Sequence, residues 1–361
     1  MPELARTLGL KLSTVEEKVR PLVRKGLVAF RDRRKKVALN PHFGYLVGID
    51  MGASHLHFAL ADFCGEILSD STEKIRPEVG PRKMIAQIKD GIRRLAGRHA
   101  GRGRFQGLAI GVPSPVDPRT GLVAFANNLA GWKNIQLAQE LIKEFRVPVC
   151  LENDANMAAI GEHWRGVARG VRDFAFLALG TGIGCGIFVN GMLHRGRAGS
   201  AGEINRLNVE WPRWNEDFGD TGYFESHASG LGIAAAGREL MSAPEPGETA
   251  SPAEERDARF VFESFHRGNA QARAVLEKIF TILGVGIADI VAVLDPDLIV
   301  LGGGVAKGAP DFMLSTVETV VHRLQPDPPP IRLSALEDKA QTYGAIFSAL
   351  TVARDAIARR L

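Results

Sequence analysis

Cysteine is scarce in this chain. Its three cysteines, Cys64, Cys150 and Cys185, are odd in number and lack CxxC or CxC spacing. This argues against a disulfide framework and a cysteine-ligated metal, and it predicts a reducing, cytoplasmic location. Long apolar runs are missing as well, because Ile290–Leu294 and Leu298–Leu301 are far shorter than a membrane span. We therefore expect no membrane contact.

The overall composition is that of a globular protein, with 45% apolar and 24% charged residues in 361 positions. That length suits two or three folded units. The formal charge of +4 is unevenly spread, because residues 1–40 alone carry +7 and the remaining residues carry −3. A short basic segment of this kind is expected where a chain meets phosphate.

Residues 1–40, called the head below, combine basic charge with helical periodicity. Ser13 is predicted to cap a helix through Lys25, with Glu16 completing a capping box. Val28–Leu39 is predicted to form a β-ribbon with the basic run Arg31–Lys36 at its tip. Two helices followed by a basic ribbon are typical of a winged helix-turn-helix.

The head resembles the winged helix-turn-helix of bacterial repressors, truncated because the first supporting helix is missing. The resemblance implies that operator DNA is contacted by Ser13, Thr14, Lys18, Arg20, Arg33, Arg34 and Lys35. Against it, Pro21 interrupts the recognition helix, and Glu16 and Glu17 bring negative charge to the same helix. The alternatives are a solvated basic tail and a degenerate remnant that packs against the rest of the chain.

Three glycine loops follow predicted strands in the remainder of the chain, at Asp50–Ser54, Gly180–Gly186 and Gly302–Val305. Glycines let a phosphate approach the backbone, hydroxyls such as that of Ser54 can donate to it, and Asp50 can hold a Mg²⁺-bound water. One such loop is often purely structural, but three in this order favour a phosphate site.

Asp154 stands in the run "ENDAN" (Glu152–Asn156), where a predicted strand ends and a helix begins. A carboxylate at the carboxyl edge of a sheet is well placed to accept a proton from a bound hydroxyl. The alternative is that Asp154 merely caps the helix. The neighbouring glycine loops favour the catalytic interpretation.

These motifs together resemble the ROK family (repressor, open reading frame, kinase) from about Tyr45 to Ala345. The match includes the three loops and "ENDAN", and also "GVPSPVDPRTGLV" at Gly111–Val123, "NNLAGW" at Asn127–Trp132 and "AGEI" at Ala201–Ile204. The resemblance implies an α/β chain with the two-lobed, actin/hexokinase-like ATPase (ribonuclease H-like) fold. A head before this body is typical of the family's sugar-responsive repressors.

The resemblance also implies site residues. Asp154 would be the catalytic base. The sugar would be bound by Asn128, Asn153, Asp154, Glu203 and Glu225. ATP, with Mg²⁺, would be bound by Asp50, Gly52, Ser54, Thr181, Gly182 and Gly303.

The zinc site of the family is not expected here. Arg206 stands where the family has a histidine, and Glu216, Phe218 and Tyr223 stand where it has cysteines. We expect an aromatic cluster of Trp211, Trp214, Phe218 and Tyr223 to replace the metal. Arg206 either pairs with Glu203, Glu216 or Glu225, or binds a sugar acid or sugar phosphate as a bidentate donor.

Three functions remain open from the sequence. The favoured one is a sugar-responsive repressor that acts as a homodimer or homotetramer on operator DNA. The second is an ATP-dependent sugar kinase, and the third is a sugar-binding protein with neither activity. The predicted units are residues 1–40, residues 41–151 with 343–361, and residues 152–342, with a loop or disordered insertion at Ser242–Arg256.

Overall fold

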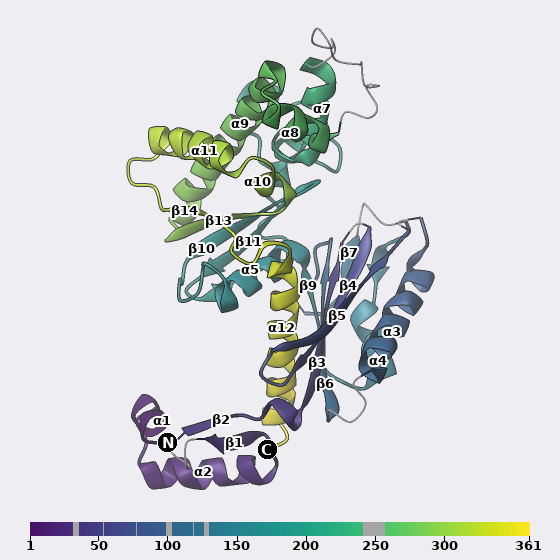
Figure 1. Cartoon of the computed structure of the whole chain (residues 1–361), viewed down its shortest axis with the longest axis vertical. Helices are drawn as coiled ribbons and strands as arrows, with labels where there is room; N and C mark the ends of the chain where they lie inside the picture. The colour runs from purple at the N-terminus through teal and green to yellow at the C-terminus, as the bar shows by residue number, and fades with distance from the viewer. Residues whose placement is uncertain are drawn as a thin grey trace.

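A computed structural model describes residues 1–31, 36–52, 54–76, 78–98, 103–117, 119–125, 130–240 and 257–361. It consists of a small head and a larger body with two five-stranded sheets (Figure 1). The predicted insertion at Ser242–Arg256 and the ribbon residues 32–35 lie outside the described residues. Within the described part of the chain, no helix has both the length and the apolar character that crossing a membrane requires.

The head contains two helices and a two-stranded antiparallel ribbon, α1 (Pro2–Leu8), α2 (Leu12–Arg24), β1 (Val28–Arg31) and β2 (Lys36–Leu39). Met1, Ala5, Val15 and Val19 form its small core. The capping prediction was wrong, because Lys11 is the N-cap residue and makes no side-chain cap hydrogen bond. The Lys11 carbonyl oxygen already accepts from Val15 N at 3.1 Å, so the helix starts before Ser13.

The first sheet has the strand order β5-β4-β3-β6-β9. Its strands are β3 (Gly44–Met51), β4 (His55–Asp62), β5 (Ile67–Lys74), β6 (Arg104–Val112) and β9 (Val149–Asn153). Strands β3, β6 and β9 run parallel, whereas β4 and β5 are antiparallel to their neighbours. The carboxyl ends of β3 and β9 therefore lie at the same edge of this sheet.

Side chains alternate between the two faces of this sheet. Val47 and Ile49 pack with helices α3 (Pro81–Gly97) and α4 (Leu137–Phe145), whereas Leu46 packs on the opposite face with α12 (Ala340–Ala358). Figure 1 shows α3 and α4 on one side of the sheet and α12 on the other. The last helix was predicted over Tyr343–Leu361. In the structure, α12 begins and ends three residues earlier, at Ala340 and Ala358.

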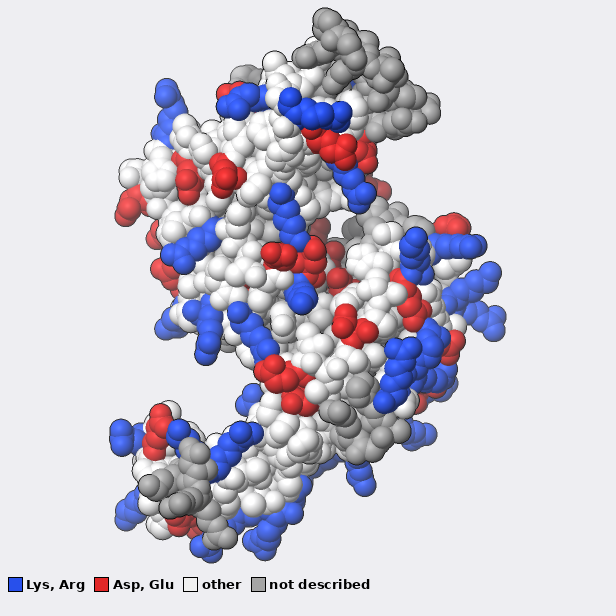
Figure 2. All heavy atoms as spheres, in the orientation of Figure 1, with Lys and Arg blue, Asp and Glu red and all other residues white. Residues whose placement is uncertain are grey.

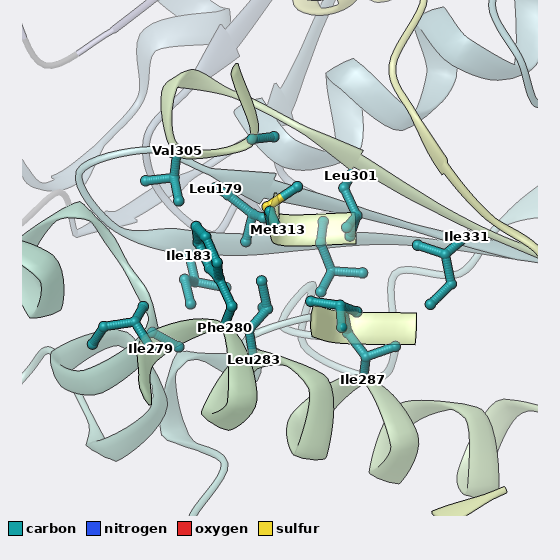
Figure 3. Packing of buried hydrophobic residues seen from close by; sticks show 14 of the residues in the cluster. Leu179, Ile183, Ile279, Phe280, Leu283, Ile287, Leu301, Val305, Met313 and Ile331 are labelled. Atoms are coloured by element: carbon teal, nitrogen blue, oxygen red, sulfur yellow. The ribbon is translucent and has the colours of Figure 1, made fainter. Parts of the chain in front are cut away.

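The second sheet has the strand order β12-β11-β10-β13-β14. Its strands are β10 (Phe174–Leu179), β11 (Ile183–Val189), β12 (Met192–Leu193), β13 (Leu298–Gly302) and β14 (Ile331–Leu333). Strands β10, β13 and β14 are parallel, whereas β11 is antiparallel to β10 and β12 is antiparallel to β11. One face is covered by the helices α6 (Tyr223–Ala228), α7 (Gly230–Leu240), α8 (Ala258–His266), α9 (Ala270–Leu294), α10 (Gly304–Gly308) and α11 (Pro310–Leu324). Figure 3 shows Leu179 and Leu301 of the sheet above Phe280 and Leu283 of α9.

Helices α5 (Asp154–Arg165) and α12 lie between the two sheets and share one apolar cluster with both. Their backbones are close, because a Cβ added at Gly344 of α12 would lie 1.7 Å from the Met157 carbonyl oxygen of α5. The same cluster contains Leu27 of the head. Figure 1 shows α12 running from the middle of the body to the head, where both chain termini lie.

Shorter elements complete the fold. They are η1 (Pro41–Phe43), η2 (Ile204–Arg206), η3 (Trp211–Arg213), η5 (Glu337–Lys339) and the antiparallel pair β7 (Val123–Phe125) and β8 (Lys133–Ile135).

Candidate functional site

Asp154 is the first residue of α5, directly after β9. The capping role belongs to Asn153, whose Oδ1 accepts from Ala155 N at 2.9 Å and from Asn156 N at 3.2 Å. One carboxylate oxygen of Asp154 also accepts from Ala155 N, at 2.8 Å. Burial raises the pKa of Asp154 to about 7, with the Ala155 amide opposing the shift and the charges of Asp50 and Glu203 adding to it. A carboxyl group with this pKa can accept or release a proton near neutral pH.

Asp50 lies near the end of β3, at the same sheet edge as Asp154. Asp50 is 5% exposed, and the Gln341 amide nitrogen donates to its two carboxylate oxygens at 2.8 and 3.0 Å. His55 Nε2 lies 3.7 Å from Asp50 Oδ2, and this polar interaction raises the pKa of His55 against the effect of burial. Ser54, which was predicted to bind phosphate, is exposed in the same loop. Gln341 and His55 were not predicted from the sequence.

The second glycine loop joins β10 to β11 and carries the exposed Thr181. It is shorter than predicted, because β11 already starts at Ile183. The Glu225 carboxylate accepts from Ile183 N at 2.7 Å, and a Cβ added at Gly182 would lie 2.2 Å from Glu225 Oε2. A side chain at position 182 would therefore push the Glu225 carboxylate, a predicted sugar-binding group, out of its place beside the loop.

The third glycine loop follows β13 and leads into α10. Gly303 has φ 97°, and a Cβ there would lie 2.4 Å from the Leu179 carbonyl oxygen at the end of β10. The second and third loops are thus neighbours at one edge of the second sheet. In addition, a Cβ at Gly180 or Gly304 would meet no heavy atom within 4 Å, so the backbone is accessible beside both loops.

Glu203 directly precedes η2, and Arg206 is the last residue of η2. Burial raises the pKa of Glu203, Arg206 opposes this, and the charge of Glu225 adds to it. The charges of Asp50 and Glu203 raise the pKa of Asp154, and the charge of Glu225 raises the pKa of Glu203. These four carboxyl groups therefore form one electrostatic cluster, called the acidic cluster below. Figure 2 shows acidic side chains, with some Lys and Arg side chains, beside the gap near the middle of the body.

Comparison with known proteins identifies the family. The ROK family model matches residues 46–352. The chain belongs to the ROK family. It is 32% identical over 280 residues to a glucokinase of Halalkalibacterium halodurans, covering 76% of this chain and 84% of the relative. It is 27% identical to a putative xylose repressor of Caldicellulosiruptor sp., covering 95% and 90% of the two chains.

The fold agrees with a solved ROK structure. A ROK family transcriptional regulator, described as a homologue of the E. coli MLC protein, superposes with a TM-score of 0.83 at 22% identity, over 97% of this chain and 91% of that one. At this identity the likeness concerns the fold alone. The mixed α/β, hexokinase-like ROK fold predicted from the sequence is confirmed.

The aromatic cluster predicted in place of the ROK zinc site is partly wrong. Phe218 and Tyr223 do pack, edge to face at 5.3 Å, and His227 stacks on Tyr223 at 4.3 Å. Trp211 and Trp214, however, are 80% and 76% exposed. The inner side of their turn is occupied by Arg213 instead, whose guanidinium lies 5.2 Å from the Phe218 ring and 5.6 Å from the Tyr223 ring.

Glu216 also has a different partner from the one considered. Arg213 binds its two oxygens at 2.8 and 2.6 Å, whereas the charge of Arg206 acts on Glu203. Within the described ranges, Arg206 makes no ion pair of 4 Å or less, and no group of three His, Cys, Asp or Glu side chains is arranged to hold a metal ion.

An ion pair between the buried Glu152 and the half-exposed Arg195, next to Asp154, was missed. Glu152 is 4% exposed and accepts from Arg195 Nε at 2.6 Å, from Asn156 Nδ2 at 2.9 Å and from Asn153 N at 3.1 Å. The pair ties the start of α5 to the segment that leads to Glu203. No local pattern in the sequence joins positions 152 and 195.

Several predicted residues belong to the head or are not described. Ser13, Lys18 and Arg20 are exposed on α2 and Thr14 is partly buried, but Glu16 and Glu17 are exposed beside them. Asn128, Arg33, Arg34 and Lys35 lie outside the described residues. The amide of Asn153 is engaged within the protein, through the cap and a 3.4 Å bond from Nδ2 to the Ser114 carbonyl.

Proposed function

We propose that this ROK protein is a sugar-responsive transcriptional regulator of carbohydrate metabolism, with a sugar-binding body and a DNA-binding head. The observation that carries the proposal is the head itself: 40 residues with a charge of +7, folded into two helices and a ribbon and attached to the body. Figure 2 shows Lys and Arg side chains projecting from this end of the molecule. The likeness to a putative xylose repressor over 95% of the chain supports it.

The proposed division is a head of residues 1–40, one lobe of residues 41–151 with 343–361, and a second lobe of residues 152–342. The sugar would bind between the lobes, against Asp154, Glu203, Glu225 and the segments that carry Asn128 and Arg206. Operator DNA would be contacted by the exposed face of α2 and the ribbon tip. Two heads are needed for two half-sites, so the active form would be a homodimer or a homotetramer.

Helix α12 offers a physical route between sugar and head. At its start, the Gln341 amide binds Asp50, and the helix packs along α5, which begins at Asp154. Near its other end, Leu350 and Ala353 share the apolar cluster with Leu27 of the head. A sugar that moves α5 would therefore shift the helix on which the head rests.

The test of regulation is DNA binding at several salt concentrations, with the DNA upstream of the chain's own gene. Lys18→Ala and Arg20→Ala should weaken binding and lower the salt slope by about 0.9 for each lost phosphate contact. Arg323→Ala, an exposed cation on α11, is the matched control and should bind like the wild type. One sugar should reverse binding. Binding that is absent, or equally strong in all variants, would contradict the proposal.

A second candidate is an ATP-dependent sugar kinase, and the pKa of Asp154 near 7 favours it. ATP fits the residues present, because the backbone is open at Gly180 and Gly304 and the Ser54 and Thr181 hydroxyls are exposed beside those loops. When bound, ATP with Mg²⁺ would supply the phosphoryl group. Asp154 would take the proton from the sugar hydroxyl, and Asp50, Gly52, Gly182 and Gly303 would line the nucleotide site. The glucokinase relative supports this candidate.

A coupled assay with ATP and a panel of hexoses tests the kinase. ATP consumption that is lost in Asp154→Asn would establish the enzyme. Sugar binding without ATP consumption, in a protein that also binds its operator, would refute the kinase and support the regulator.

A further inference from the structure

Trp211 and Trp214 form an exposed aromatic pair. They are 80% and 76% exposed. The other large apolar residues that are exposed in the described chain are leucine, isoleucine, valine and methionine. Trp211 starts the 3₁₀ turn η3, and Trp214 follows its last residue, with Trp214 N bonded to the Trp211 carbonyl at 3.2 Å. Residues three apart in such a turn lie on the same side, so the two indoles share one face.

The turn is held firmly from its other side. Arg213 binds Glu216 through two hydrogen bonds, and its Nη1 lies 3.0 Å from His227 Nε2. The loop is further fixed by Asn208 Oδ1, which accepts from Glu210 N at 2.9 Å. An aromatic pair on a braced turn loses little conformational entropy when a ligand stacks on it.

The loop that carries the pair starts and ends at the proposed sugar site. It follows η2, which contains Arg206, and it leads into α6, which contains Glu225. Asn205 Nδ2 donates to the Thr221 carbonyl at 3.2 Å, which brings the two ends of the loop together. The contact between Arg213 and His227 places the turn against α6, two residues beyond Glu225.

We propose that Trp211 and Trp214 bind the outer ring of a disaccharide whose inner ring occupies the site at Asp154. This inference rests on the proposed sugar site and narrows its ligand class from a single sugar to a glycoside. The C–H face of a sugar ring suits an aromatic surface, and ring hydroxyls can donate to carboxylates. Glu210 and Glu216, about half exposed on the same loop, provide such acceptors.

The test compares calorimetric affinities for glucose and xylose with those for cellobiose, maltose and xylobiose. The double variant Trp211→Ala/Trp214→Ala should lose about threefold to tenfold in affinity for the disaccharide that binds, and should keep its monosaccharide affinity within about twofold. Val293→Ala, which removes another exposed apolar side chain (82% exposed), is the matched control and should change neither affinity.

A second measurement is independent of affinity. The disaccharide should protect the wild-type protein's tryptophan fluorescence from acrylamide, and the monosaccharide should not. If monosaccharides bind and the double variant keeps its disaccharide affinity, the aromatic site is refuted and the proposed function stands. If no sugar of either kind binds any variant, the proposed function fails first. If the double variant loses only self-association in sedimentation, the pair is a protein interface and the inference is refuted.

Discussion

Gly344→Ala tests whether the crossing of α5 and α12 holds the body together. The added Cβ would lie 1.7 Å from the Met157 carbonyl oxygen and 2.7 Å from its carbonyl carbon. Gly161 faces the same crossing, since its Cβ would lie 2.0 Å from the Ala340 carbonyl oxygen. Both obstacles are helix backbone, so no side chain can rotate away to make room.

The size of the effect follows from that geometry. Ordinary contact at about 3.5 Å requires the two helices to separate by more than about 1 Å along a shared apolar cluster. Overpacking of a core costs about 1–3 kcal/mol, and a backbone obstacle belongs at the upper end of that range. We expect Gly344→Ala to lower the free energy of unfolding by about 3 kcal/mol, which for a chain of 361 residues lowers the Tm by about 4 °C.

Urea and thermal denaturation of the full chain measure this effect. Gly97→Ala is the control, because Gly97 ends helix α3 and a Cβ there meets no heavy atom within 4 Å. That variant should be neutral or more stable by up to about 1 kcal/mol. The reasoning is refuted if Gly344→Ala melts within about 1 °C of the wild type while still binding sugar normally.

Two further predictions concern Asp154 and the neighbouring ion pair of Glu152 and Arg195. The pKa of Asp154, about 7 in the folded chain, exceeds its ordinary value, so the folded state retains a proton that the unfolded state releases, and stability falls as pH rises from about 4 to about 7. The free energy of unfolding of Asp154→Asn should therefore exceed that of the wild type at pH 8, and the difference should become smaller toward pH 4. Urea titrations that show a constant difference would contradict this. Arg195→Ala leaves the buried Glu152 without its cation and should lower the free energy of unfolding by about 2 kcal/mol. This is less than for a fully buried pair, because Arg195 is 39% exposed. Adding Glu152→Gln to it should restore part of the loss in a double-mutant cycle, and strictly additive losses would show that the pair is not coupled.

The parts of the site that were predicted from the sequence are those that local patterns determine. Asp154 starts a helix directly after a strand, and Gly303 follows another, so their places at sheet edges depend only on neighbouring residues. Parallel pairing then brings the strand ends to common edges. The hexokinase-like fold, in contrast, was predicted as a whole through the resemblance to the ROK family, whose motifs occur in the same order in this chain.

The parts that were missed depend on contacts between distant positions. Gln341 binds Asp50 and Arg195 binds Glu152, across long stretches of sequence that give no periodic signal. The error at Trp211 and Trp214 has the same origin. Aromatic content indicated a packed cluster, but the inner position was taken by the guanidinium of Arg213, which satisfies Glu216 and covers the rings at once.

If α12 couples the sugar site to the head, the effects of sugar and of DNA on each other's binding must be equal in size. Gln341 at the start of the helix binds Asp50, and residues near its other end share an apolar cluster with Leu27, so the head and the acidic cluster both contact this helix. If sugar weakens operator binding through this helix, operator DNA must weaken sugar binding by the same factor, because coupling free energies are mutual. A sugar that released DNA without such a reciprocal effect would have to act elsewhere, and α12 would then be only a support for the head.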